Sequence, residues 1–134
     1  MEFEKKLIES CKRVYEQLGF GLMELTYEKG LKIELQSLGV KCDNEEYVNL
    51  YYEDRDNEKH FLTSLRMDIV VKKPSCVIEL KTVKSVLKKD DKEYYQALRY
   101  QKITGVEKCY LVNFGIKGLE IYNCNDDDFK NLII

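Results

Sequence analysis

The sequence lacks the long apolar run that a membrane-spanning helix requires. Such a helix needs about 20 consecutive, mostly apolar residues, and no run in this chain approaches that length. The first segment is acidic and amphipathic, so it also lacks the basic start and apolar centre of a secretory signal peptide. We therefore expect no membrane association and an intracellular location, cytoplasmic or nuclear, rather than secretion.

Cysteine and histidine patterns typical of metal sites are also missing. The chain has five cysteines and one histidine, and no Cys-X-X-Cys pair. An odd number of cysteines, each beside apolar residues, is typical of reduced thiols in a core rather than of zinc sites or disulfides. The histidine, His60, has no neighbour at ligand spacing in the sequence, and we interpret it as a surface residue.

Repeats, linkers and low-complexity tracts are absent, apart from a run of three aspartates at 126–128. The length of 134 residues is that of one domain, which can bury roughly two-thirds of its unfolded surface. An apolar content of 44% with 34% charged residues is typical of a globular chain. We expect a single domain over residues 1–134 with a short acidic tail at its end.

Apolar periodicity predicts the order of the secondary structure. Spacings of three and four residues predict helices, and alternating or β-branched runs predict strands. The expected helices are 3–18, a second ending at 39, and 93–104, and the expected strands are 40–52 (as one or two), 60–71, 76–81, 108–113 and 119–123.

The stretch from Arg66 to Lys81 is the centre of this pattern, with two β-branched runs joined by a Lys-Lys-Pro-Ser turn. Side chains alternate between strand faces, so Arg66 and Asp68 share one side, and Glu79 and Lys81 share a side of the next strand. Charged groups within apolar strands are costly unless they are paired or bind a metal. The residues alone leave both interpretations open.

Ten residues separate Asp68 from Glu79 and one separates Glu79 from Lys81, and this strand-turn-strand spacing resembles the core of the PD-(D/E)XK nuclease superfamily. Met67 stands where the superfamily name has proline. Further blocks are similar, in the same order, to those of the GxxExxY family of this superfamily, over roughly residues 15–122. These blocks are residues 19–28, 34–35 with 38–39, 66–68, 77–81, 96–100 with 104–105, and 111–115.

The resemblance implies a fold and a site. The fold is a restriction-endonuclease-like α/β sandwich, a central mixed β-sheet flanked by helices. Asp68, Glu79 and Lys81 would be catalytic, with the two carboxylates as metal ligands. Glu28 is the expected third ligand, because the segment from Glu28 to Gly39 resembles a helix of Holliday-junction resolvases that offers a metal-binding glutamate.

Accessory residues are expected around this site. Gln96 and Tyr100 resemble the Gln-X-X-X-Tyr element of RecB-like nucleases, which implies a catalytic Gln96 and an accessory Tyr100. Tyr27 and Arg66 are further accessory candidates.

Glu24 is the last accessory candidate. It lies one helical turn from Glu28, so the two repel each other and one of them needs a cationic partner. A solvated helix flank is the alternative.

The GxxExxY family often has a histidine three residues before the glutamine that corresponds to Gln96. This chain has Glu93 at that position.

The implied chemistry is phosphodiester hydrolysis in DNA, with repair or recombination as the setting. Carboxylates suit Mg²⁺ or Mn²⁺, which take oxygen ligands and keep several waters. Such an ion lowers the pKa of bound water and neutralises charge on the phosphate. Lys81 would orient that water and stabilise the developing charge.

The charge distribution bears on the substrate. A net charge of −2 gives no general attraction to nucleic acid. Residues 66–102, however, hold ten Lys or Arg against five Asp or Glu, whereas the rest of the chain holds twelve against nineteen. This basic segment either follows a phosphate backbone or is a solvated surface.

Two hypotheses of different class remain. The first is a magnesium-dependent nuclease, favoured because Asp68, Glu79 and Lys81 are all present. The second is a catalytically silent module on the same fold that binds nucleic acid or a protein. Nucleases of the superfamily commonly pair, so the resemblance also makes a homodimer an open expectation.

Overall fold

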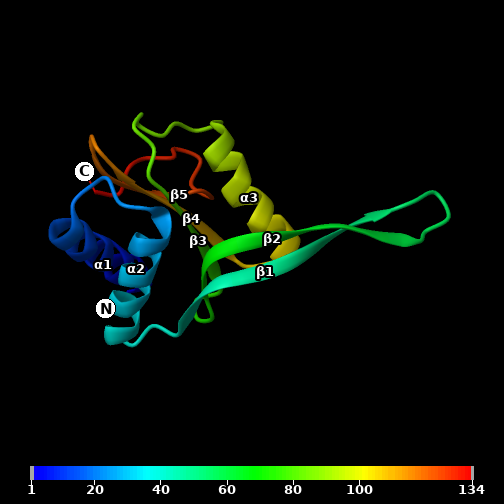
Figure 1. Ribbon diagram of the computed structural model, residues 1–134, viewed down its shortest axis with the longest axis horizontal. Helices are drawn as coiled ribbons and strands as arrows, with labels where there is room; N and C mark the ends of the chain where they lie inside the picture. Colours follow the sequence, from blue (N-terminus) through cyan, green and yellow to red (C-terminus); the bar gives the residue numbers. More distant parts are fainter. Residues whose placement is uncertain (1, 134) are drawn as a thin grey trace.

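A computed structural model describes residues 2–133 of the chain (Figure 1). Its elements are, in order, α1 (Phe3–Leu18), α2 (Glu24–Ser37), β1 (Cys42–Glu53), β2 (Lys59–Val71), β3 (Cys76–Lys81), α3 (Lys92–Thr104), β4 (Lys108–Gly115) and β5 (Gly118–Asn123). Every helix and strand expected from the apolar periodicity is present close to its expected bounds. The segment expected as one or two strands is the single strand β1. None of the helices in the described residues is long and apolar enough to cross a membrane.

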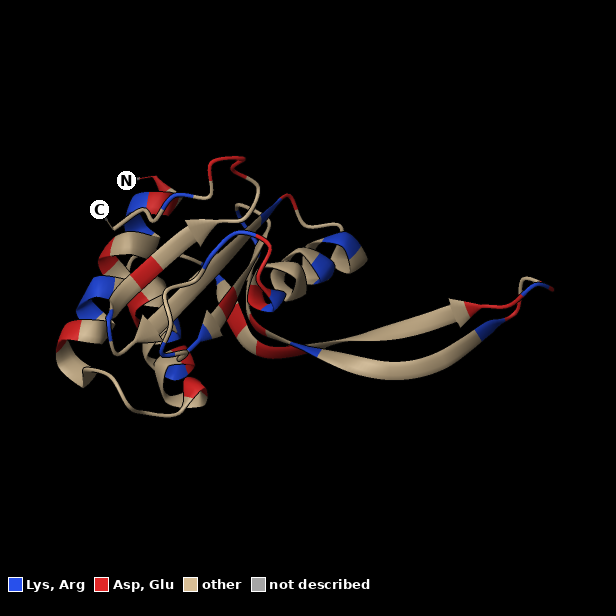
Figure 2. Cartoon of the chain, turned by 90° about the horizontal axis from the view of Figure 1, so that it is seen from above, with Lys and Arg blue, Asp and Glu red and all other residues tan. Residues whose placement is uncertain are grey.

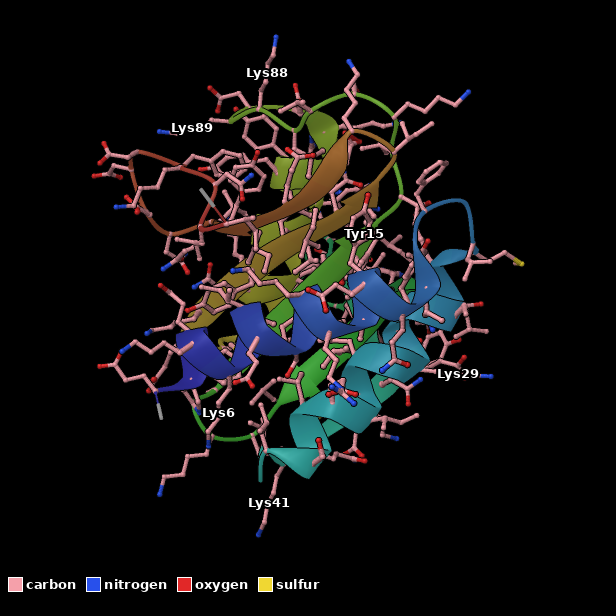
Figure 3. All side chains as sticks on the ribbon, turned by 90° about the vertical axis from the view of Figure 1, so that its left-hand side faces the viewer. Lys6, Tyr15, Lys29, Lys41, Lys88 and Lys89 are labelled. Atoms are coloured by element: carbon pink, nitrogen blue, oxygen red, sulfur yellow. The ribbon has the colours of Figure 1, made fainter. Side chains whose placement is uncertain are left out.

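The strands form one sheet in the order β1-β2-β3-β4-β5. β3 and β4 run parallel, with α3 as the connection between them, and the other neighbours are antiparallel. Helices α1 and α2 lie side by side on one face of the sheet, and α3 covers the other (Figures 1 and 3). This mixed sheet between helices confirms the predicted α/β sandwich.

Alternation along the central strands divides the core into two layers. Ile78 and Tyr110 are fully buried among the residues of α1 and α2. Val77 packs on the opposite face with Tyr100 of α3, and Leu111 packs there with Ala97. All five cysteines are buried as free thiols, as the sequence indicated.

The segment after β5 folds back along the outer edge of that strand. Leu132 N–H donates to the carbonyl of Ile121 at 2.8 Å, and Ile121 N–H donates to Asn131 Oδ1 at 3.0 Å. Phe129 is buried and stacks on Tyr122, with ring centroids 4.2 Å apart. The short acidic tail expected from the sequence is thus an acidic loop followed by a packed segment that covers this sheet edge.

Strands β1 and β2 continue beyond the sheet. β2 pairs with β3 only at Ile69, Val70 and Val71, whereas β1 and β2 pair with each other as far as Glu53 and Lys59. The two strands therefore leave the sheet as a two-stranded ribbon, which projects past α3 (Figure 1). We call this ribbon, residues 46–65, the β1–β2 arm. The sequence patterns predicted its strands but not its projection.

Candidate active site

The ladder between β2 and β3 ends where Asp68 and Glu79 meet. Its last backbone pair is Ile69 with Ile78, and Asp68 and Glu79 are the next residues along. Leu80 N–H donates to Asp68 Oδ2 at 2.8 Å, and Asp68 N–H donates to Glu79 Oε1 at 3.3 Å. These two backbone N–H groups therefore donate to carboxylate oxygens, and not to the backbone carbonyls that a longer β2–β3 ladder would supply. The strands part at these two acids, and both carboxyl groups are fixed at the opening.

Burial dominates the electrostatics of this carboxyl pair. Glu79 is 3% exposed, and burial followed by the negative charge of Asp68 raises the pKa of Glu79 to about 9. Burial also raises the pKa of Asp68, although the Leu80 N–H and the Arg66 charge oppose that shift. The positive charge around the pair is thus too small to keep both carboxyl groups ionised near neutral pH, and an added cation would favour their ionised forms.

Arg66 connects Asp68 to Glu28 on α2. Its Nη1 lies 2.6 Å from Asp68 Oδ1, and its Nη1 and Nη2 donate to the two carboxylate oxygens of Glu28 at 2.9 and 2.7 Å. Glu28 is buried, and Asn44 on β1 also donates to it at 3.1 Å. The expected cationic partner of the Glu24 and Glu28 pair is therefore Arg66, and Glu28 is the acid it binds. Both oxygens of Glu28 are engaged by this contact.

Lys81 and Tyr100 also lie near the carboxyl pair. Lys81 follows Glu79 on the same face of β3, is partly buried, and makes no ion pair with any of residues 2–133. Its charge opposes the upward shift of the Glu79 pKa. On α3, burial and then the charges of Glu79 and Asp68 raise the pKa of Tyr100 to about 12. The Lys81 ammonium group is thus not engaged by an acid in the described part of the chain.

Gln96 lies one turn before Tyr100 on α3. It is exposed, and within residues 2–133 its side chain makes no hydrogen bond. The structure brings Asp68, Glu79, Lys81 and Tyr100 together, but does not bring Gln96 into a polar contact with them.

Comparison with known proteins identifies the family. A family model described as the PD-(D/E)XK nuclease superfamily matches residues 1–122. The chain belongs to this superfamily. The crystal structure of SSO0001 is similar to it with a TM-score of 0.58 and 16% identity, over 92% of this chain and 77% of that chain, a likeness of fold. No curated protein matches the chain. Nucleases of the PD-(D/E)XK superfamily usually use divalent metal ions, so the carboxyl pair is the candidate metal centre of this member.

Two other predicted site residues lie on α2 of this PD-(D/E)XK domain. Glu24 is exposed, and its charge raises the pKa of Asp68 as the weakest of several causes. Tyr27 is fully buried: its hydroxyl donates to the Gly19 carbonyl at 2.6 Å and accepts from Leu22 N–H at 3.3 Å. The contacts of Tyr27 therefore secure the turn between α1 and α2.

Asn44 was missed by the sequence reasoning. It accepts a hydrogen bond from Lys32 at 3.1 Å and donates to Glu28, so it fixes the buried carboxylate from β1. Its only signal was a polar position on the inward side of a strand, which is too common to single out a residue.

A second group of potential metal ligands lies at the tip of the β1–β2 arm. His60 Nε2 lies 2.7 Å from Asp54 Oδ2, and ligand atoms of Asp54, Glu58 and His60 all lie within 4.8 Å of one another. His60 is exposed as predicted, but the expectation that no neighbour has ligand spacing was wrong, because the turn folds the two acids back toward it. This group lies at the far end of the arm from the sheet (Figure 1).

The lysine-rich loop after β3 is anchored to the sheet. Asn113 Oδ1 accepts from Val83 N–H at 3.0 Å, and Asn113 Nδ2 donates to buried Glu120 at 2.8 Å. Glu120 also accepts from Leu87 N–H at 2.9 Å. Lys88 extends away from the body (Figure 3), whereas Lys89 Nζ donates to the carbonyl of Asp127 at 3.2 Å. A fixed backbone therefore presents Lys88 on the chain that leads out of the candidate site.

Proposed function

We propose that this chain is a divalent-metal-dependent nuclease that hydrolyses phosphodiester bonds in DNA, with Mg²⁺ or Mn²⁺ as its metal. One observation carries the proposal: buried Glu79 and partly buried Asp68 lie together where β2 and β3 part. Superfamily membership supplies the class of activity. The sequence blocks that resemble the GxxExxY family support a place in that family.

The donor set fits a hard divalent ion. Carboxylate oxygens are the ligands that Mg²⁺ and Mn²⁺ take, and the raised pKa of Glu79 reflects a site with too little positive charge. A bound ion of this kind lowers the pKa of a coordinated water and neutralises charge on a phosphate. Asp68 and Glu79 would hold it, because the ladder hydrogen bonds fix both carboxyl groups at one opening.

Lys81 and the basic loop supply the positive charge that a phosphodiester needs. Lys81 lies two residues beyond Glu79 on the same strand, and its ammonium group is free to donate to the attacking water and to a phosphate oxygen. Lys88, on the anchored loop, would contact the flanking phosphates. Tyr100 would shield the carboxyl pair from the side of α3.

Glu28 is the most heavily engaged of the three carboxylates, because both of its oxygens accept from the Arg66 guanidinium and Oε2 also accepts from Asn44. We therefore propose Asp68 and Glu79 as the primary ligands and Glu28 as a ligand gained through movement of Arg66. Gln96 and Glu24 are exposed, so they would contact substrate rather than metal.

The Arg66 contacts also support a second candidate function. Arg66 is 2.6 Å from Asp68 and binds Glu28 with both nitrogens, so it neutralises part of the cluster internally. A catalytically silent module that binds nucleic acid or a protein would retain such a structural ion pair.

Cleavage of plasmid and oligonucleotide DNA with Mg²⁺, Mn²⁺ or EDTA separates the two functions. We expect metal-dependent cleavage by the native protein and a loss of about a hundredfold or more in Glu79→Gln, which keeps the side-chain shape but removes a metal-binding charge. Glu34→Gln is the matched control, because Glu34 pairs with Arg13 on the helical surface. Equal cleavage by native protein and Glu79→Gln would show that the site is elsewhere. Absence of cleavage in every native sample would favour the silent module.

A further inference from the structure

The β1–β2 arm carries large apolar side chains that cover nothing. Tyr47, Tyr51 and Phe61 are 60%, 51% and 58% exposed, and Tyr51 and Phe61 meet edge to face with centroids 6.0 Å apart. Register places the three on one face. Tyr51 pairs with Phe61, and Tyr47 lies four residues before Tyr51 on β1, an even spacing that puts both tyrosines on the same side of the strand. On the other face, Tyr52 is 62% exposed. Asn49 and Ser64, which are hydrogen-bonded to each other, separate Tyr47 from the Tyr51–Phe61 pair on its face. Several large exposed apolar side chains on one projecting element mark an interaction site.

The arm gives the chain more surface than a monomer of its mass normally exposes. The accessible surface is 8205 Å², whereas a folded monomer of 15.9 kDa is expected to expose about 7,350 Å². The excess is about 850 Å², and a standard protein interface buries about 800 Å² on each partner. The surplus area therefore matches one side of a stable interface.

Charge argues against nucleic acid as the occupant of this surface. Residues 46–65 carry five acidic side chains and two basic ones. Figure 2 shows that most of the arm is neither acidic nor basic and that charged residues gather toward its tip and base. A polyanion would meet net negative charge and find few cations for its phosphates. An apolar protein surface is the chemistry that fits.

The outer edge of β1 is available for strand pairing. Within residues 2–133, β1 pairs with β2 alone and forms one end of the sheet order. An edge strand with unpaired N–H and C=O groups is a template for another strand. If a second β1 pairs antiparallel about an axis at Asn49, Tyr47 faces the partner's Tyr51 and Val48 faces the partner's Leu50. This register places apolar residues opposite apolar residues on both sides of the central pair, in which Asn49 of one copy faces Asn49 of the other.

We propose that the β1–β2 arm is the interface of a symmetric homodimer, in which the β1 edges of two copies pair antiparallel about Asn49 and join their sheets. The contact is isologous, so one patch serves both copies. The exposed aromatic row of each arm then packs against that of the other. The two nuclease sites are joined through continuous strands.

Sedimentation velocity at micromolar concentrations tests the proposal without any measure of cleavage. The native protein should have a molecular mass from sedimentation of twice the 15.9 kDa of the chain. Tyr51→Glu should sediment as a monomer, because the substitution introduces a charge into the aromatic row. Ile116→Glu is the matched control, since Ile116 is 53% exposed on the turn between β4 and β5. It should remain a dimer.

A cross-link tests the register. The native cysteines are all buried, so Asn49→Cys adds the one exposed thiol and should form a covalent dimer under mild oxidation, whereas Ile116→Cys should not. A native protein that stays monomeric, or a Tyr51→Glu variant that dimerises as well as the native protein, overturns the interface. If the native protein is monomeric and Tyr51→Glu also weakens its binding to DNA, the arm is a nucleic-acid contact and the interface is overturned.

Discussion

The carboxyl pair of Asp68 and Glu79 makes stability depend on pH in a direction that one substitution can isolate. Burial raises the pKa of Glu79 from an ordinary value of 4.5 to about 9. Between these two values the folded protein holds a proton on Glu79 that the unfolded chain has lost. The stabilisation is therefore complete below pH 4.5 and is lost as the pH rises through about 9.

The magnitude follows from proton linkage. One proton held only by the folded state changes the free energy of unfolding by about 1.4 kcal/mol per pH unit. From pH 5 to pH 8 the metal-free protein should therefore lose about 2–4 kcal/mol through Glu79, or roughly 10 °C in melting temperature. Asp68, whose pKa is also raised by burial, adds a contribution of the same sign. Glu79→Gln has no proton to lose and should be more stable than the native protein at pH 8.

Urea unfolding followed by circular dichroism, in EDTA and at each pH, measures this difference. Glu34→Gln serves as the control, because it makes the same chemical change at a surface ion pair and leaves Glu79 intact. The quantity to compare is the slope of the free energy of unfolding against pH. If the native protein and Glu79→Gln lose stability in parallel from pH 5 to pH 8, Glu79 is ionised in the fold and the description of the carboxyl pair is wrong.

Three further outcomes are expected. Mg²⁺ at a hundredfold excess over its Kd should stabilise the native protein by about 2.7 kcal/mol, seen as a melting shift of several degrees that is absent in Asp68→Ala; an unchanged native melting curve contradicts metal binding. Arg66→Gln should lower the free energy of unfolding in EDTA by about 3–5 kcal/mol, because it leaves buried Glu28 without its cationic partner. Mg²⁺ should raise the free energy of unfolding of this variant more than that of the native protein. Equal increases in urea titrations would mean that Arg66 does not compete with the metal. Tyr27→Phe should lower the free energy of unfolding in urea by about 1–2 kcal/mol through the lost partners of Gly19 and Leu22, and a neutral result would mean that water replaces them.

Much of the fold followed from the sequence because each helix and strand buries one face. The apolar positions of α1 predicted its bounds, and the β-branched runs around Asp68 and Glu79 predicted the β2–β3 hairpin. The projection of the arm was not predictable in this way, because the apolar residues around exposed Tyr47 and Tyr51 would equally suit a strand that packs on a core. Periodicity shows which side chains share a face, but not whether anything covers it.

The candidate site divides along similar lines. Asp68, Glu79 and Lys81 were predicted together because strand alternation and a short turn determine their neighbourhood. The contact between Glu28 and Arg66 spans 38 positions, so only a general need for a cation near Glu28 was visible. Helical period places Gln96 one turn from Tyr100, but the packing of α3, which leaves Gln96 exposed, depends on tertiary contacts.

The two edges of the sheet set a limit on how many copies can assemble. The segment that follows β5 occupies that strand's outer edge through the hydrogen bonds of Leu132 and Asn131. Growth by strand addition is therefore blocked at this end and open at the β1 end. Once two β1 edges have met, both ends of each sheet are occupied, so association through the sheet ends stops at a pair. The strand edge that stays open is that of β2 along the arm, where, within residues 2–133, β2 pairs with β1 alone.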